Sequence, residues 1–183
     1  MGYAAALTKA WEELSGLSAA GTRKVRFFSD VYVIDFSGGK VSLLPSGAAA
    51  KDFTAVLILH YAIQEIKGLT PLVNEWISFK ELSGGEAYYP AFRKRAIDPI
   101  IGKYGDDPSG LYSNLAKLKG KKTVGADSGM VMEAFKGVPV MVLVWKADVE
   151  FSAEANLLFD RSVSGILSTE DTAVLAGYIT KYV

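Results

Sequence analysis

The first part of the chain changes its hydrophobic period after one short helix. Leu7, Trp11 and Leu14 share one stripe, which predicts an amphipathic helix over residues 3–15. The period then falls to two, and Ser37-Gly38-Gly39 supplies a turn, so we expect an antiparallel meander. Its three predicted strands are Lys24–Ser29, Val31–Phe36 and Lys40–Leu44.

Residues 51–67 are predicted to form a helix that is apolar around most of its circumference. Such a helix is usually buried in the centre of a domain, and Gly68 is expected to end it. Beyond it, strand-like and helix-like patterns alternate irregularly. The predicted elements are a short strand over Glu75–Leu82, helical segments over residues 87–104 with an interruption near Pro99, a helix over Leu111–Leu118, and strands over Gly129–Phe135, Pro139–Ala147 and Ala155–Phe159.

The end of the chain carries the signature of a helix with its own N-terminal cap. Ser168 is followed three residues later by Asp171, which resembles a capping box, and an apolar face follows. Runs of strands and runs of helices, rather than strict alternation, indicate the α+β class. We therefore expect one domain over residues 1–183. It should have a mainly antiparallel sheet, formed by the N-terminal meander and the C-terminal strands, packed with a central buried helix, a helical middle segment and a C-terminal amphipathic helix.

Composition and charge remove several classes of function. The 20 basic and 20 acidic residues balance, so the strong positive field typical of nonspecific nucleic-acid binding is missing, and no nucleic-acid partner is expected. The chain has no cysteine and one histidine, which excludes disulfides, thiolate metal sites and multi-histidine sites within it. The apolar runs are too short to span a bilayer and the N-terminal segment lacks the pattern of a secretory signal. We expect a cytoplasmic protein with no membrane partner.

No group of residues has the spacing of a known catalytic motif. Asp127, Asp148 and Asp160 fall near predicted strand ends, where they could meet around a cation or simply cap turns. His60 is predicted on the less buried side of the central helix. It could act as a base, a pH switch or a single axial ligand to a tetrapyrrole, or be a hydrogen-bonded residue at the edge of the core. No metal site, cofactor or catalytic residue follows from these patterns.

The stretch from Glu75 to Arg95 interleaves aromatic rings with cations. Such a combination can stack on a planar ligand and pair with its anionic groups. The alternative is that the rings pack in the core and the cations are solvated. The residues predicted to bind a ligand are His60, Trp76, Lys80, Tyr89, Phe92 and Arg93.

The same stretch resembles a prokaryotic family known as domain of unknown function 3786. The resemblance extends from about Lys24 to the C-terminus. It rests on Leu59-His60-Tyr61, Glu75-Trp76-Ile77-Ser78-Phe79-Lys80-Glu81-Leu82-Ser83-Gly84-Gly85, Tyr89, Phe92-Arg93, Val140–Trp145 and Leu158-Phe159-Asp160. The family has no established activity. Members fused to a Cys-rich iron–sulfur segment imply a link to anaerobic redox or corrinoid metabolism, whereas this chain has no cysteine to hold such a cluster.

Three functions therefore stay open. The leading hypothesis is a non-catalytic binding or accessory domain that uses the residues from Trp76 to Arg93, together with His60, to bind a small planar or anionic ligand or a redox protein partner. The second is a small-molecule enzyme that uses carboxylates and a metal ion. The third is a protein-interaction module, whose oligomeric state the sequence does not define.

Overall fold

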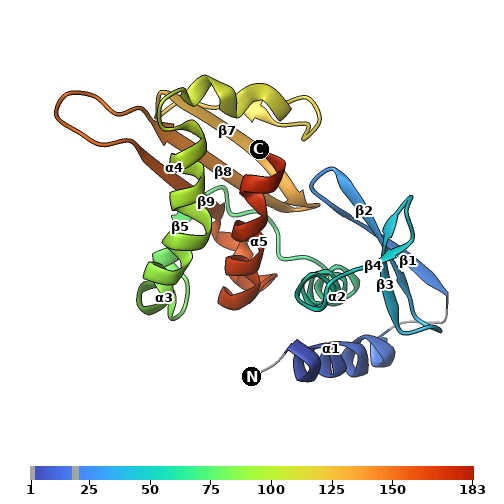
Figure 1. Cartoon of the computed structure of the whole chain (residues 1–183). Coiled ribbons are helices and arrows are strands. Elements are labelled where there is room, and N and C mark those ends of the chain that lie inside the picture. Colours follow the sequence, from blue (N-terminus) through green and yellow to red (C-terminus); the bar gives the residue numbers. More distant parts are fainter. Residues whose placement is uncertain (1–2, 18–20) are drawn as a thin grey trace.

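The computed structural model describes residues 3–17 and 21–183, and these residues form an α+β fold with two antiparallel sheets, as predicted (Figure 1). The α-helices are α1 (Tyr3–Leu17), α2 (Asp52–Lys67), α3 (Gly85–Phe92), α4 (Asp98–Tyr104) and α5 (Thr169–Tyr182). The strands are β1 (Thr22–Phe27), β2 (Asp30–Asp35), β3 (Lys40–Leu44), β4 (Ala48–Ala49), β5 (Trp76–Ser78), β6 (Lys121–Lys122), β7 (Ser128–Phe135), β8 (Val138–Trp145) and β9 (Glu154–Asp160).

The N-terminal sheet is the predicted meander with one short strand added. Its order is β1-β2-β3-β4, and every neighbouring pair is antiparallel. At the turn between β2 and β3, the Asp35 carboxylate accepts hydrogen bonds from the backbone N–H groups of Ser37 and Gly38, both at 3.0 Å. Gly39 follows with a φ of 57°, a conformation that glycine adopts without strain. The turn therefore joins β2 and β3 as the antiparallel hairpin that the sequence pattern predicted.

The C-terminal sheet has the order β5-β9-β8-β7-β6 and is also antiparallel throughout. Its central strand β8 is buried along nearly its whole length, which explains its continuous apolar sequence. α4 packs against β8 and β9. The strand β5 comprises only three residues of the predicted Glu75–Leu82 strand, because the chain turns into a 3-10 helix, η1 (Phe79–Glu81), directly after it.

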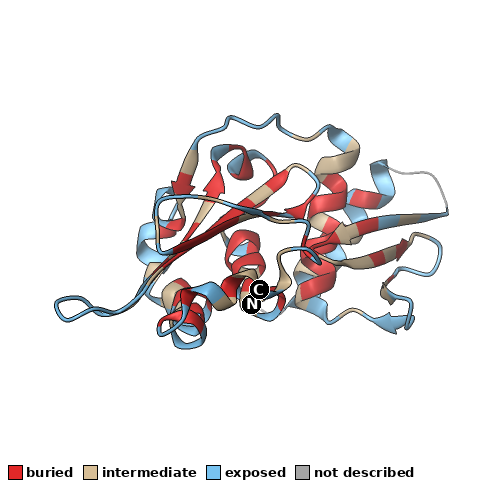
Figure 2. Ribbon diagram, turned by 90° about the horizontal axis from the view of Figure 1, so that it is seen from above, coloured by how far each residue is buried: buried red, intermediate tan, exposed pale blue. Residues whose placement is uncertain are grey.

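Helix α2 lies between the N-terminal sheet and α5, and most of its residues are buried, as its sequence predicted (Figures 1 and 2). α1 packs along one side of α2. His60 lies on the less buried side of the helix, also as expected. Among the described residues, no helix has both the length and the apolar character needed to cross a membrane.

The helical middle segment runs on through Pro99, where an interruption was expected. Pro99 lies in the first turn of α4, where the missing N–H group of proline breaks no helical hydrogen bond. The irregularity comes earlier, in a π-helical turn, η2 (Arg93–Ile97), that joins α3 to α4. The helix predicted over Leu111–Leu118 is instead a 3-10 helix, η3 (Pro108–Asn114), followed by turns.

A cluster of aromatic rings joins the two sheets. The Phe27 ring from β1 stacks on Phe135 from β7, with centroids 4.7 Å apart, and Tyr61 from α2 stacks on the same Phe135 ring at 4.2 Å. Tyr178 of α5 meets Phe27 edge-on at 5.2 Å. The backbone N–H of Phe28 also donates to the carbonyl oxygen of Ala134 at 2.7 Å. Buried side chains of both sheets therefore belong to one continuous core.

Candidate functional site

The predicted binding stretch is spread over four consecutive elements. Trp76 begins β5, Lys80 lies in η1, Tyr89 and Phe92 lie in α3, and Arg93 opens η2. The structure brings some of these side chains together and separates others.

Lys80 and Tyr89 form the contact that most resembles the predicted binding surface. The Lys80 ammonium group lies 4.4 Å from the centroid of the Tyr89 ring, and it also lies 3.9 Å from the Glu86 carboxylate. Phe92 is buried, and its ring stacks on Phe79 with centroids 4.0 Å apart. Phe92 therefore packs in the core, whereas Lys80 and Tyr89 reach solvent.

Arg93 and Trp76 have other neighbours. The Arg93 guanidinium pairs with the Asp98 carboxylate at 3.1 Å, one helical turn further along the chain. Trp76 is half-buried and lies opposite Asp160 in the β5–β9 ladder. In the described part of the chain, no ring stacking, ion pair or cation–π contact connects Trp76 or Arg93 to the Lys80–Tyr89 pair.

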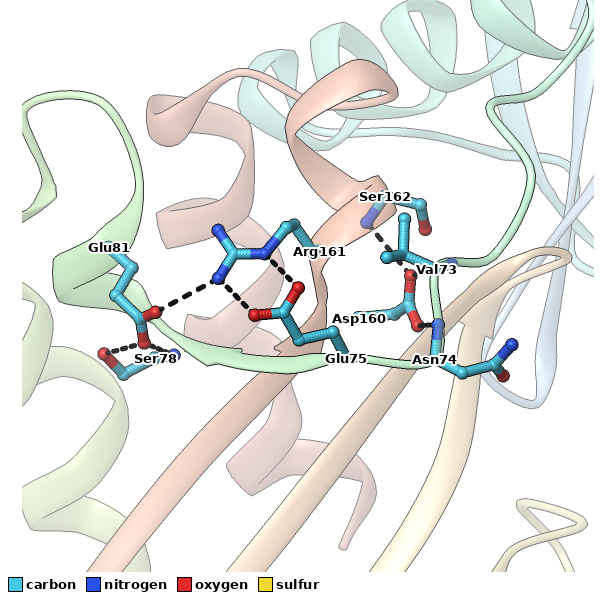
Figure 3. Close-up of polar contacts among 8 residues, drawn as sticks. All are labelled: Val73, Asn74, Glu75, Ser78, Glu81, Asp160, Arg161 and Ser162. Atoms are coloured by element: carbon cyan, nitrogen blue, oxygen red, sulfur yellow. Dashed lines mark hydrogen bonds and ion pairs between the residues drawn. The ribbon is translucent and has the colours of Figure 1, made fainter.

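Asp160 lies where the segment before β5 passes the end of β9 (Figure 3). It is buried, and its carboxylate accepts three backbone hydrogen bonds, from Val73 at 3.0 Å, from Asn74 at 2.7 Å and from Ser162 at 3.0 Å. Burial raises the pKa of the Asp160 carboxyl, but the hydrogen bonds from Ser162, Val73 and Asn74 outweigh it and keep the pKa below its ordinary value. Asp160 is thus an ionised group that fixes this crossing.

Arg161 extends the network through partly exposed side chains (Figure 3). Its guanidinium donates two hydrogen bonds of 2.6 Å to the two carboxylate oxygens of Glu75, and it lies 3.5 Å from the Glu81 carboxylate. Glu81 in turn accepts hydrogen bonds from the backbone N–H and the hydroxyl of Ser78. Each charge already has a partner, so this network joins β5, η1 and β9 rather than presenting free groups to a ligand.

His60 is part of a second polar arrangement, between α2 and the start of α5. Its Nδ1 atom lies 3.0 Å from both carboxylate oxygens of Asp171, and the Ser168 hydroxyl donates to Asp171 Oδ2 at 2.7 Å. The capping box predicted from Ser168 and Asp171 is confirmed. A carboxylate oxygen accepts this hydrogen bond when Nδ1 carries the proton, and that tautomer leaves the lone pair of neutral His60 on Nε2.

A hollow of about 200 Å³ adjoins the hydrogen-bonded chain from Ser168 through Asp171 to His60, called the relay below. The polar lining of the hollow consists of Glu13, His60, Gln64, Ser168 and Asp171. The His60 side chain is 33% exposed and the Asp171 side chain 10%, so the histidine reaches the hollow while its partner is nearly covered. The hydrogen bond with Asp171 raises the pKa of His60 above its ordinary value, although burial acts against it.

The three aspartates considered as cation ligands each cap backbone N–H groups instead. Asp127 accepts from Lys146, Asp148 accepts from Glu150 and Phe151, and Asp160 has the partners described above. Residues 3–17 and 21–183 contain no group of three histidine, aspartate or glutamate side chains placed to hold a metal ion.

Sequence reasoning named His60 but did not connect it with Asp171, which was recognised only as part of a helix cap. The two residues are 111 positions apart, and no spacing rule relates them. Glu75 and Arg161 were missed for the same reason. Their signal was indirect, since two of the blocks that carry the family resemblance, around Trp76 and around Phe159, meet in the β5–β9 ladder.

The comparisons with known proteins identify a family but no function. The family model described as "Domain of unknown function (DUF3786)" matches residues 9–182, nearly the whole chain. No curated protein and no solved structure matches it.

Proposed function

Since the chain belongs to the DUF3786 family, whose description assigns no activity, we propose from its own geometry that it is a non-catalytic binding domain in which His60 is the ligating group. The ligand would be a planar macrocycle that carries a metal, and Nε2 of His60 would supply one axial bond to that metal. The hydrogen-bonded relay from Ser168 through Asp171 to His60 is the observation that supports this proposal.

The relay has the form that metal-ligating histidines use. Such a histidine usually donates its other ring N–H to a carboxylate, which fixes the tautomer and the orientation of the ring. Asp171 supplies that carboxylate, and Ser168 holds it in place. The donor set also favours a particular ligand. A bare metal ion needs several protein ligands, whereas the metal of a tetrapyrrole has its equatorial ligands already and needs only axial ones.

The size of the hollow favours a ligand that this chain covers only in part. At about 200 Å³ it is smaller than the pockets of roughly 300–1,000 Å³ that enclose drug-sized molecules. A macrocycle would therefore leave much of its surface to solvent or to a second protein. An accessory role beside a redox protein partner, in cytoplasmic anaerobic redox or corrinoid metabolism, belongs to the same proposal.

The remaining predicted binding residues belong to the proposal only in part. In this proposal Lys80 and Tyr89, whose side chains contact each other, would meet an anionic edge of the planar ligand, and Trp76 and Arg93 keep this role as a prediction. The loop before α3 is tied to the His60 region, because the Thr169 hydroxyl donates to the carbonyl oxygen of Ser83 at 2.8 Å.

A spectroscopic titration tests the role of His60. Purified protein is titrated with diaquacobinamide and, separately, with haemin, neither of which carries its own imidazole ligand. We expect the visible bands to shift as a histidine replaces water, and His60→Ala to abolish this shift. Asp171→Asn should weaken binding by about tenfold or more, the effect typical of losing an outer hydrogen-bond partner.

Free imidazole supplies the matched control. Added to the His60→Ala variant, it should restore part of the shifted spectrum, while circular dichroism confirms that the variant is folded. If His60→Ala binds both macrocycles as tightly as the wild type and with the same spectrum, the proposal is wrong.

A protein-interaction role is the second candidate, because the β8–β9 hairpin projects from the molecule (Figures 1 and 2). Val149 and Phe151 in this loop are strongly exposed. Exposed apolar groups of this kind are common at interfaces. Analytical ultracentrifugation over a range of concentrations would reveal self-association as a rise in sedimentation coefficient.

A further inference from the structure

A second and larger hollow lies between the start of α2 and the second half of α5, away from His60, and faces β3 and β4. Its volume is about 370 Å³, within the range of pockets that enclose small molecules. The helices contribute Phe53 and Thr54 from the first turn of α2 and Tyr178 and Lys181 from the second half of α5. His60 does not line this hollow.

Three aromatic side chains form its apolar walls. Tyr32 comes from β2, Phe53 from α2 and Tyr178 from α5. The rings of Phe53 and Tyr178 have centroids 6.0 Å apart and planes inclined by 32°. The short side chains of residues 48–50 line the hollow from the β4 side. Walls of this kind suit a flat, conjugated molecule, because ring faces stack favourably.

The charged side chains of the lining are both cations. Lys51 and Lys181 are exposed, and no acidic residue lines the hollow. None of the ion pairs formed among residues 3–17 and 21–183 includes either lysine. The Lys181 ammonium group lies 5.9 Å from the Tyr178 ring centroid and 5.6 Å from that of Tyr182, so it is kept beside the aromatic wall.

The inner surface offers one further polar contact. The hydroxyl of Thr54, which is buried, is hydrogen-bonded to the Tyr178 hydroxyl. Burial raises the pKa of Tyr178, although the hydrogen bond with Thr54 acts against it, so the phenol remains protonated at neutral pH. Two hydroxyl groups share one bond, which leaves one hydroxyl proton able to donate to a ligand.

We propose that this hollow is a binding site for a small aromatic or conjugated molecule that carries a negatively charged group. The ring system lies in the hollow against the rings of Phe53 and Tyr178, and the anionic group meets Lys51 and Lys181. The site is separate from the one at His60 and does not depend on the proposed macrocycle. Like the stretch from Trp76 to Arg93 in the sequence, this hollow combines aromatic rings with cations, but it does so with other residues.

A matched pair of fluorescent probes tests the proposal. Anilinonaphthalene sulfonate carries a flat ring system and a permanent negative charge, and phenylnaphthylamine carries the same rings without the charge. We expect the wild-type protein to bind the sulfonate more tightly than the neutral probe. The Lys51→Ala/Lys181→Ala double variant removes both charged contacts, so it should bind the sulfonate at least about tenfold more weakly, and the neutral probe within about twofold of wild type.

Two further variants locate the binding. Lys94→Ala/Lys117→Ala removes two exposed lysines elsewhere and should leave both affinities unchanged. Phe53→Leu keeps an apolar side chain but removes a wall ring, so both probes should bind several-fold more weakly. The fold of each variant is checked by its thermal unfolding curve.

The His60→Ala variant separates this proposal from the previous one, because it should bind both probes as the wild type does. The proposal is overturned if the sulfonate binds the Lys51→Ala/Lys181→Ala variant as tightly as the control pair of lysine variants. It is equally overturned if Phe53→Leu changes neither affinity, since the probes then bind another apolar surface.

Discussion

At the scale of single residues, two carboxylates are placed in very different ways although both are largely buried. Asp160 accepts three backbone N–H groups and serves as a structural anion. Asp171 accepts from its own helix cap and also contacts the only histidine of the chain. A carboxylate whose partners are all backbone groups fixes geometry, whereas one that holds an imidazole also sets where a proton and a lone pair lie. For this reason the His60–Asp171 pair is a better candidate for a functional site than the Asp160 network.

The His60–Asp171 contact should make stability depend on pH. The pKa of His60 is raised in the folded protein, so its stabilising contribution is fully present below its ordinary value of 6.5 and is lost as the pH rises through the folded value. Because the side chain is one-third exposed, His60→Ala should lower the free energy of unfolding by less than about 1 kcal/mol. Urea denaturation at about pH 5.5 and about pH 9 should show the larger loss at the lower pH.

Asp171→Asn provides the control for this prediction. It weakens the helix cap at every pH, and it also weakens the hydrogen bond and removes the Asp171 charge that raise the pKa of His60. In an Asp171→Asn background, the effect of His60→Ala on the free energy of unfolding should therefore depend much less on pH. An equal effect of His60→Ala at both pH values would contradict the prediction.

At the scale of elements, the short strand β5 owes its position to polar contacts more than to its own sequence. Only three residues pair with β9. The Asp160 and Arg161 networks fix the chain before them through Asn74 and Glu75 and after them through Glu81. The pattern of Trp76, Ile77 and Phe79 suggested a longer strand. The chain leaves the sheet because Glu81 accepts hydrogen bonds from Ser78 and thereby closes a 3-10 turn. A local capping interaction here outweighs strand propensity.

Asp160→Asn should therefore destabilise the protein by about 2 kcal/mol, since an amide replaces the charged acceptor of buried hydrogen bonds. The pKa of Asp160 is lowered in the folded state, so this difference should be present above 3.8, its ordinary value, and should shrink as the pH falls through the folded value. Urea denaturation across this range measures it. Asp148→Asn, an exposed carboxylate that also caps a turn, should change stability by less than about 0.5 kcal/mol. Equal effects of the two variants would show that burial of Asp160 is unimportant.

At the scale of the whole molecule, the aromatic cluster makes the two sheets parts of one core. Phe27 contacts rings from β7 and α5, and α2 contributes Tyr61 to the same cluster. Arg26 also pairs with Glu133 at 2.8 Å beside this junction. Both proposed sites lie along the interface of α2 with α5, so the packing that joins the sheets also shapes the two hollows.

Phe27→Ala should destabilise the whole fold by about 3–5 kcal/mol, the range for removing a fully buried phenylalanine. Because the core is continuous, Trp11 in α1 and Trp145 in β8 should report the same unfolding midpoint in single-tryptophan variants, with and without the substitution. Phe151→Ala, at a side chain that is 70% exposed, is the control and should change stability by less than about 0.5 kcal/mol. If the two single-tryptophan variants without Phe27→Ala showed different midpoints, the sheets would unfold independently.

The sequence by itself determined the α+β class, the N-terminal meander, the buried central helix and the capped C-terminal helix. These features follow from periodicity and from turn and cap residues a few positions apart, which are local properties of the chain. Tertiary structure alone decided that Phe92 packs in the core, that Asp171 holds His60, and that Tyr32, Phe53 and Tyr178 surround one hollow. These outcomes depend on which distant segments pack together, and the identity of a single residue carries no information about a partner more than a hundred positions away.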